Sequence, residues 1–266
     1  MGVCIDTILV DLHNTSTNAA TLTNASVTNS GDSLSVRSFD TGAWAKMESL
    51  FVQGSGTTQA RILSPRLHDN VTGITFETTE SPAEFLFPQE VSEPMYSSDT
   101  LQIQLSAAAS SDSVAAALMY YSNVDGISAN VATWAQVKAS MLHLKTVEVA
   151  VTSSATIGAW TDTVITTTEN QLKADYTYAV LGFESTVALA AMGVKGPATG
   201  NLRICAPGAT STLDITSYFV ELSNQQGTPH IPIIKANDRG ATNISVAANT
   251  ASVAAHVYVY LAQLSS

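Results

Sequence analysis

The feature that most constrains this chain is a period-two alternation of apolar and polar residues along almost its whole length. Such alternation over four to eight residues predicts a strand with one buried face, because successive side chains point to opposite faces of a sheet. Turn-forming segments rich in Gly, Asn, Asp and Pro separate the alternating segments, which is typical of all-β sandwiches and barrels. Twelve segments show the pattern: 7–12, 33–39, 46–52, 59–63, 73–78, 101–107, 145–151, 161–167, 176–183, 201–206, 213–220 and 243–248.

Two further strand-like segments nearly repeat each other. SVAAALMYY begins at Ser113 and SVAAHVYVY begins at Ser252, 139 residues later, and five of the nine positions are identical. Each reads as the last strand of a unit that occurs twice, with about fourteen short strands in all. We expect alternate side chains of both segments to face inward against an opposing sheet. These are Val114, Ala116, Leu118 and Tyr120 in the first copy, and Val253, Ala255, Val257 and Val259 in the second.

Other landmarks recur in the same order. RILSP starts at Arg61 and RICAP at Arg203, 142 residues apart, while the triplets GIT and DIT are 141 residues apart. The same shift carries the strand around Thr7 to the neighbourhood of Glu148. Matches in one order at nearly constant spacing predict a tandem duplication.

One segment has helical rather than strand periodicity. In residues 128–144 the apolar side chains fall on one stripe, and Ser128 is a suitable N-cap. The sequence therefore predicts an all-β chain of two tandem jelly-roll barrels with about eight strands each. The first barrel covers residues 1–127, a short connecting helix covers 128–144, and the second barrel covers 145–266.

The chain has few charged residues, and most of them are acidic. Only 12% of the residues are charged, against roughly 25% in ordinary soluble domains, and the net charge is −11. Ser, Thr, Asn and Ala fill the positions that Lys and Glu would usually occupy, so we expect much of the surface to be covered in an assembly. The eleven basic residues are scattered, which argues against direct binding of nucleic acid.

No grouping of residues predicts catalysis, and we expect no catalytic, cofactor-binding or metal-binding residues. None of the five histidines belongs to a metalloprotease motif, and we expect His256 to be a hydrogen-bonded or surface residue rather than a ligand. The Gly-rich stretches 54–56 and 193–200 predict turns, because neither precedes a Lys-Ser/Thr pair and a helix. Cys4 and Cys205 each lie in an apolar run and are expected to be buried, with a bridge between them left open.

Two segments are expected to be long loops that project from a barrel end or clasp a neighbour, 77–94 and 221–240. The first is acidic, so either a solvated loop or a calcium site remains open. Its carboxylates are Glu77, Glu80, Glu84, Glu90 and Glu93. The start of the chain lacks the basic segment of a secretory signal, and no apolar run is long enough to span a membrane.

With its paired landmarks and central helix, the chain resembles the double jelly-roll major capsid proteins of icosahedral, tailless bacteriophages that contain an internal membrane. That resemblance implies a homotrimer whose six barrels form a pseudo-hexameric block, and a shell tiled with such trimers. It further implies a location in the virion after synthesis in the host cytoplasm. Other virion proteins, minor capsid proteins and the internal membrane are the implied partners, and no enzymatic activity or cofactor is implied.

A second hypothesis is a phage fibre or adhesin-type β-sandwich that binds carbohydrate through aromatic side chains at loop ends. Tyr96, Trp160 and Tyr218 are the candidates for such contacts. A shell protein should form trimers and larger particles, whereas an adhesin should stay small or fibrous and bind glycans. An enzyme built on a β-sandwich is the third class considered.

Overall fold

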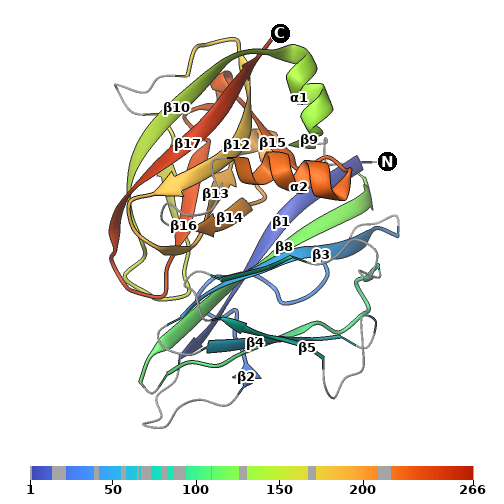
Figure 1. Cartoon of the computed structure of the whole chain (residues 1–266), viewed down its shortest axis with the longest axis vertical. Coiled ribbons are helices and arrows are strands. Elements are labelled where there is room, and N and C mark those ends of the chain that lie inside the picture. Colours follow the sequence, from blue (N-terminus) through green and yellow to red (C-terminus); the bar gives the residue numbers. More distant parts are fainter. Residues whose placement is uncertain are drawn as a thin grey trace.

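A computed structural model describes residues 2–13, 22–38, 42–54, 58–64, 66, 73–78, 83–86, 94–108, 110–125, 131–166, 172–208 and 217–265. The described chain is mostly β, with several antiparallel sheets and two α-helices (Figure 1). Eight strands form an N-terminal unit: β1 (Gly2–His13), β2 (Thr23–Asn24), β3 (Trp44–Gly54), β4 (Thr58–Leu63), β5 (Ile74–Thr78), β6 (Ala83–Leu86), β7 (Gln102–Leu105) and β8 (Asp112–Val124).

Eight further strands form a C-terminal unit: β10 (Met141–Thr152), β11 (Thr161–Val164), β12 (Thr177–Ser185), β13 (Leu189–Lys195), β14 (Ile204–Gly208), β15 (Ile231–Lys235), β16 (Asn243–Ala247) and β17 (Ala254–Leu264). The two units are joined by the short strand β9 (Val131–Ala132) and the helix α1 (Trp134–Ser140). The C-terminal unit also contains the helix α2 (Tyr218–Gln226) and the 3-10 turns η2 (Pro197–Thr199) and η4 (Ala236–Asp238).

The two units repeat one strand order. In the N-terminal unit one sheet has the order β1-β8-β3-β6 and the other β2-β7-β4-β5. The C-terminal unit has β10-β17-β12-β15, with β9 added at the edge, and β11-β16-β13-β14. Counted within each unit, both follow first-eighth-third-sixth and second-seventh-fourth-fifth. The repeated SVAA strands, β8 and β17, are therefore equivalent, each lying between the first and third strands of its unit.

The four sheets form a stack, which we number from the N-terminal unit outwards. The first sheet is β2-β7-β4-β5, the second β1-β8-β3-β6, the third β11-β16-β13-β14 and the fourth β10-β17-β12-β15-β9. In Figure 1 the first sheet lies at the bottom of the molecule and the fourth in the upper part, with β10 and β17 at the upper left. The units meet where β13 and β14 of the third sheet contact β1, β3 and β8 of the second.

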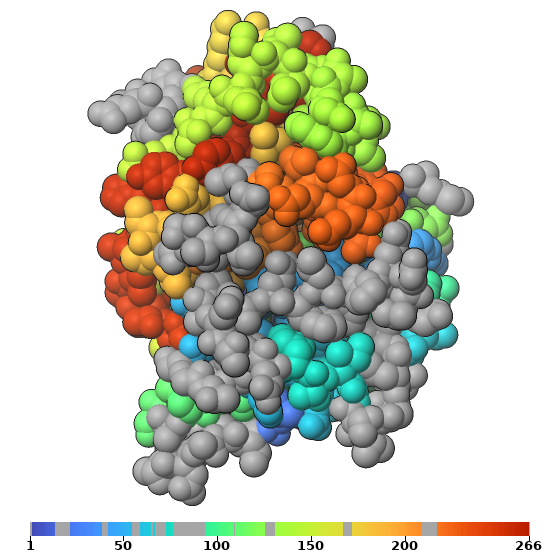
Figure 2. Space-filling model, viewed as in Figure 1, coloured from blue at the N-terminus to red at the C-terminus, as the bar shows by residue number. Residues whose placement is uncertain are grey.

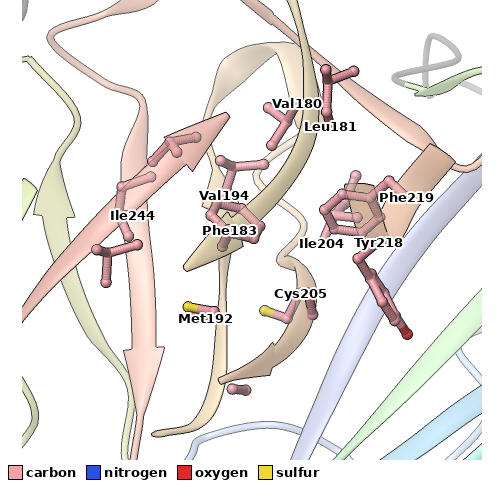
Figure 3. Close-up of a cluster of buried hydrophobic side chains, with 14 of the residues drawn as sticks. Val180, Leu181, Phe183, Met192, Val194, Ile204, Cys205, Tyr218, Phe219 and Ile244 are labelled. Carbon is pink, nitrogen blue, oxygen red and sulfur yellow. The ribbon is translucent and has the colours of Figure 1, made fainter. Parts of the chain in front are cut away.

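Two hydrophobic cores result from this stacking. One lies between the first and second sheets and includes Met47, Ile62 and Met119. The other fills the C-terminal unit and continues across the contact between the units to Leu118 and Tyr120 of β8. Figure 3 shows part of it, where side chains of β12, β13, β14, β16 and α2 pack together.

The residues predicted to face the interior of the N-terminal unit from β8 were the wrong set. Val114, Ala116, Leu118 and Tyr120 face the C-terminal unit, while the alternate residues face the first sheet. Because β8 is buried on both faces, its alternation does not reveal which face meets which sheet. In β17 the expected residues Ala255, Val257 and Val259 are buried, but Val253 precedes the strand and is half-buried.

The structure confirms one of the predicted duplication landmarks and contradicts another. Thr7 and Glu148 lie in β1 and β10, the first strands of the two units, as expected. The pairing of Arg61 with Arg203 is wrong, because Arg61 lies in the fourth strand of its unit and Arg203 directly precedes the fifth strand of the other. The DIT triplet lies outside the described residues.

The helix predicted over residues 128–144 is shorter than expected. It covers Trp134–Ser140, and its N-cap is Thr133, whose hydroxyl accepts a hydrogen bond from the Gln136 backbone N–H at 3.2 Å. The Gln136 side chain accepts from the Thr133 N–H in return, which completes a capping box. Val131 belongs to a strand and residues 141–144 begin β10, while Ser128 lies outside the described residues.

Three other expectations were wrong. The predicted strand 213–220 is helical from Tyr218, because α2 buries Tyr218, Phe219 and Leu222 at helical spacing. Residues 33–38 of the predicted strand 33–39 are irregular. The predicted loop 221–240 instead contains the rest of α2, then β15 and η4.

Candidate functional site

Strands β10 and β17 of the fourth sheet leave their outer face open to solvent in the described structure, whereas residues 178–183 of β12 are buried on both faces. On β17 the side chains that point outward are Ala254, His256, Tyr258 and Tyr260, and their partners on β10 are Thr152, Ala150, Glu148 and Thr146. The two alanines, the two threonines and His256 are exposed. The equivalent face of β1, β3 and β8 in the second sheet packs on the C-terminal unit. The second and fourth sheets are equivalent in strand order, but within the described chain only the second packs its outer face against another sheet.

Polar pairs join the longer side chains of this open face. The Tyr260 hydroxyl donates to Glu184 Oε2 at 2.6 Å, and that hydrogen bond raises the pKa of Tyr260 to about 12. His256 Nδ1 lies 2.6 Å from Glu148 Oε1. His256 is therefore a surface residue with a neighbouring carboxylate, as expected.

Large apolar side chains extend this face at the start of β10. Leu144 is 69% exposed and Leu142 47% exposed, and Met141 is also exposed. Strand β10 pairs only with β17 among the described strands, so it forms an edge of the sheet. A hollow of about 400 Å³ lies here, lined by Leu144, Lys145, Thr146, Leu181, Tyr260 and Leu261. Figure 2 shows this end of the molecule, with α1 and the start of β10 at the surface.

The opposite end of the stack presents a polar face. On the first sheet Arg61, Gln102 and Gln104 alternate with the buried residues Ile62 and Ile103. Arg61 Nε donates to Thr75 Oγ1 across the sheet at 3.0 Å. The face thus displays amides, a hydroxyl and a guanidinium.

A polar cavity lies beside the contact between the units. It has a volume of about 510 Å³, and its lining includes Asp6, Asp32, Arg37 and Tyr121. The carboxylate of Asp6 pairs with Arg37 and accepts a hydrogen bond from the Arg203 backbone N–H at 3.2 Å. Burial raises the pKa of Asp6, and the Arg37 guanidinium offsets that effect only in part. These bonds join β1 to the chain before β14 and thus hold the units together.

Asp162 forms a second polar cluster next to this contact. It accepts hydrogen bonds from Ser245 Oγ at 2.6 Å, Arg203 at 3.1 Å and Lys195 at 3.2 Å. Burial alone would raise the pKa of Asp162, but the Ser245 hydrogen bond and the two cations outweigh it and lower the pKa. These clusters were not predicted from the sequence, although Asp6, which interrupts an apolar strand, was a usable signal.

A histidine is buried where the two units meet. His230 is fully buried, stacks on Tyr120 with ring centres 5.2 Å apart, and places Nε2 3.7 Å from Glu48 Oε1. Its other nitrogen, Nδ1, lies 3.2 Å from the Thr228 hydroxyl and 3.1 Å from the Thr228 backbone carbonyl. The geometry is that of a structural contact between β3, β8 and the chain before β15.

The three aromatic residues considered as carbohydrate contacts differ in their exposure to solvent. Tyr218 is buried, and its hydroxyl lies 3.0 Å from Ser49 Oγ. Trp160 is half-buried, donates from Nε1 to Asp32 at 3.1 Å, and lies beneath the Arg203 guanidinium. Tyr96 is 40% exposed and has Arg66 over its ring. The structure therefore does not bring the three together on one surface for glycan stacking.

Both cysteines are free and buried, in separate cores. Burial raises the pKa of each thiol to about 12. The bridge left open by the sequence is absent between these two described residues.

The structure describes only some of the other features that the sequence predicts. The side chains of the acidic segment 77–93 lie outside the described part of the chain. Among the residues that the structure describes, no group of three His, Cys, Asp or Glu side chains could hold a metal ion. Within the same residues, no helix is both long and apolar enough to cross a membrane. Residues 193–200 form the end of β13, then η2 and a turn at Gly200.

Comparison with known proteins gives no family. No protein-family model matches the sequence, and a search of curated proteins finds no match either.

Proposed function

We propose that each unit is a jelly-roll barrel and that the chain is the major capsid protein of an icosahedral, tailless virus. The repeated strand order carries this proposal. In each unit the first strand pairs with the eighth, the second with the seventh, the third with the sixth and the fourth with the fifth. Two four-stranded sheets connected in this way form a jelly roll, the architecture of many viral capsid proteins.

The proposed role is mechanical. Three chains would form a pseudo-hexameric homotrimer from six barrels, and trimers would tile the shell of a virion. Each contact between copies would be weak, and the lattice would be strong because many contacts act together. The low charge content and the exposed Ala and Thr side chains of the fourth sheet support this role, because such faces can be buried with little desolvation cost.

An enzymatic role is not proposed. His230 and its neighbouring Glu48 are buried where the two units meet, out of reach of a substrate, and both cysteines are buried with high pKa values. The carbohydrate-binding alternative has less support, since Trp160 and Tyr218 are engaged in intramolecular contacts.

The test is the state of assembly of the purified chain. Sedimentation velocity should resolve trimers and, at higher concentration, particles of many trimers. A chain that remains a monomer of 27.9 kDa at every concentration would contradict the capsid role. A glycan array applied to the same sample separates the alternative, because a shell protein should give no specific signal.

A further inference from the structure

We propose that a proton on Asp11 controls the contact between the two units. The contact closes tightly when the carboxyl group of Asp11 is neutral, and it loosens when that group is ionised. Asp11 lies in β1 and packs on the segment that follows β10 in the C-terminal unit. The inference concerns a contact within one chain, so it holds or fails independently of the proposed capsid role.

The C-terminal unit covers the side chain of Asp11. The residue is 8% exposed, and Gly158 packs directly on it. A Cβ added at Gly158 would lie 2.6 Å from Asp11 Cγ and 2.7 Å from Oδ1. Gly158 also has a φ of +72°, in the left-handed region that favours glycine. Glycine at this position therefore lets the segment approach the carboxyl group more closely than any other residue would allow.

One oxygen of this carboxyl group is buried without a partner. Within the described residues, Asp11 Oδ1 is shielded from solvent and makes no hydrogen bond. Buried polar groups are nearly always hydrogen-bonded, because an unpaired group loses its bonds to water and gains none in exchange. The loss is much larger for an ionised group than for a neutral one. The geometry around Oδ1 therefore favours the neutral carboxyl group.

A hollow of about 220 Å³ lies beside Asp11, where the two units meet. Its other lining residues are polar in the N-terminal unit and aliphatic in the C-terminal unit: His13, Asn29 and Asp112 on one side, and Ala155, Ile157 and Ala251 on the other. The lining residues of the C-terminal unit carry no charge, so none of them compensates an ionised Asp11. Asn29 joins the units at this point, because its Nδ2 donates a hydrogen bond to the Ile157 carbonyl oxygen at 3.1 Å.

Two titratable groups of the N-terminal unit face Asp11. Asp112 is the first residue of β8, and its carboxylate pairs with His13 at the end of β1. Burial is the largest cause of the raised pKa of Asp11, and the negative charge of Asp112 raises it further. His13 acts in the opposite direction and lowers the pKa of Asp11, but it does not cancel the other two effects.

The sign of the pH dependence follows from these contacts. The pKa of Asp11 is higher in the folded chain than in the unfolded chain, so its contact is most stable below the unfolded pKa, about pH 4. Stability is lost as the pH rises through the folded pKa of Asp11. Loss of the proton places a negative charge between β1 and residues 154–158. The packing of Gly158 and the Asn29–Ile157 hydrogen bond are the contacts that should loosen first.

The first experiment compares the wild-type chain with Asp11→Asn, which keeps the shape of the side chain and removes its titration. The unfolding equilibrium constant of each is measured in urea between about pH 3 and pH 7. The wild-type constant should rise relative to that of the variant as the pH increases. The rise should be about tenfold for each pH unit by which the folded pKa exceeds the unfolded one. The matched control is Asp125→Asn at an exposed aspartate, for which the ratio should change less. A ratio for Asp11→Asn that is independent of pH would overturn the proposal.

Two further measurements identify the group and the contact. Carbon-13 NMR of the Asp11 carboxyl group in the wild-type chain should show titration above about pH 4, and titration at or below that value would overturn the proposal even if Asp11→Asn does not fold. Amide exchange of residues 154–158, corrected for the intrinsic effect of pH, should accelerate with rising pH in the wild-type chain but not in Asp11→Asn. His13→Gln should retain the dependence of the wild-type chain on pH. Loss of that dependence in His13→Gln would assign it to the histidine and contradict the role of Asp11.

Discussion

Replacing Leu118 by alanine tests the packing between the two units. Leu118 is fully buried on the face of β8 that meets the C-terminal unit, between Ala116 and Tyr120. Strands β1 and β3 hold β8 on both sides, so the surrounding structure cannot collapse into the space left by the lost methyl groups. Buried Leu→Ala substitutions cost about 2–5 kcal/mol, and we expect about 3 kcal/mol here. For a chain of this size the midpoint of thermal unfolding should fall by roughly 6–12 °C.

Met119→Ala is the matched control, because Met119 is also fully buried but faces the first sheet. Both variants should lose stability in urea unfolding. Hydrogen exchange should differ, since only Leu118→Ala weakens the contact that covers β13 and β14 and should accelerate exchange in those strands beyond the control. A loss below about 1 kcal/mol, or equal exchange of β13 and β14 in the two variants, would refute the stacking described here.

Three further predictions concern single sites. Cys4 and Cys205 should not react with a thiol reagent at pH 8 in the folded chain and should both react in denaturant; rapid reaction of either native thiol would contradict its burial. Gly193→Ala should cost about 1–3 kcal/mol in chemical unfolding, because a Cβ there would lie 2.4 Å from the carbonyl oxygen of Ile204; unchanged stability would show that β13 and β14 are not so close. Asp162→Asn should cost about 1–2 kcal/mol at pH 7. The pKa of Asp162 is lower in the folded chain than in the unfolded chain, so the stabilisation by its carboxylate is present above the unfolded pKa and is lost as the pH falls through the folded pKa. The difference in unfolding free energy between Asp162→Asn and wild type should therefore narrow below about pH 4. A difference that is constant with pH would contradict this.

The strands were predictable from the sequence where one face is buried and the other is not. Segment 145–151 alternates cleanly because β10 has an open outer face, and the structure places it in that strand. The all-β class and the equivalence of the two SVAA strands follow from the same local pattern, without knowledge of the partners.

What the sequence did not determine depends on contacts between distant segments. A one-residue shift in register exchanges the two faces of a strand, so the near-identity of β8 and β17 could not show which side chains meet the other unit. The strand predicted at 213–220 failed because aromatic and β-branched residues favour strands locally, while packing of α2 on β12 decided the outcome. The polar clusters around Asp6 and Asp162 join residues far apart in the chain, so their partners could not be predicted from local spacing.

Cryo-electron microscopy of the assembled chain is the most direct test of the account. The account predicts trimeric blocks with six similar lobes, two from each chain. Isolated chains, or assemblies without six-lobed trimeric blocks, would contradict it.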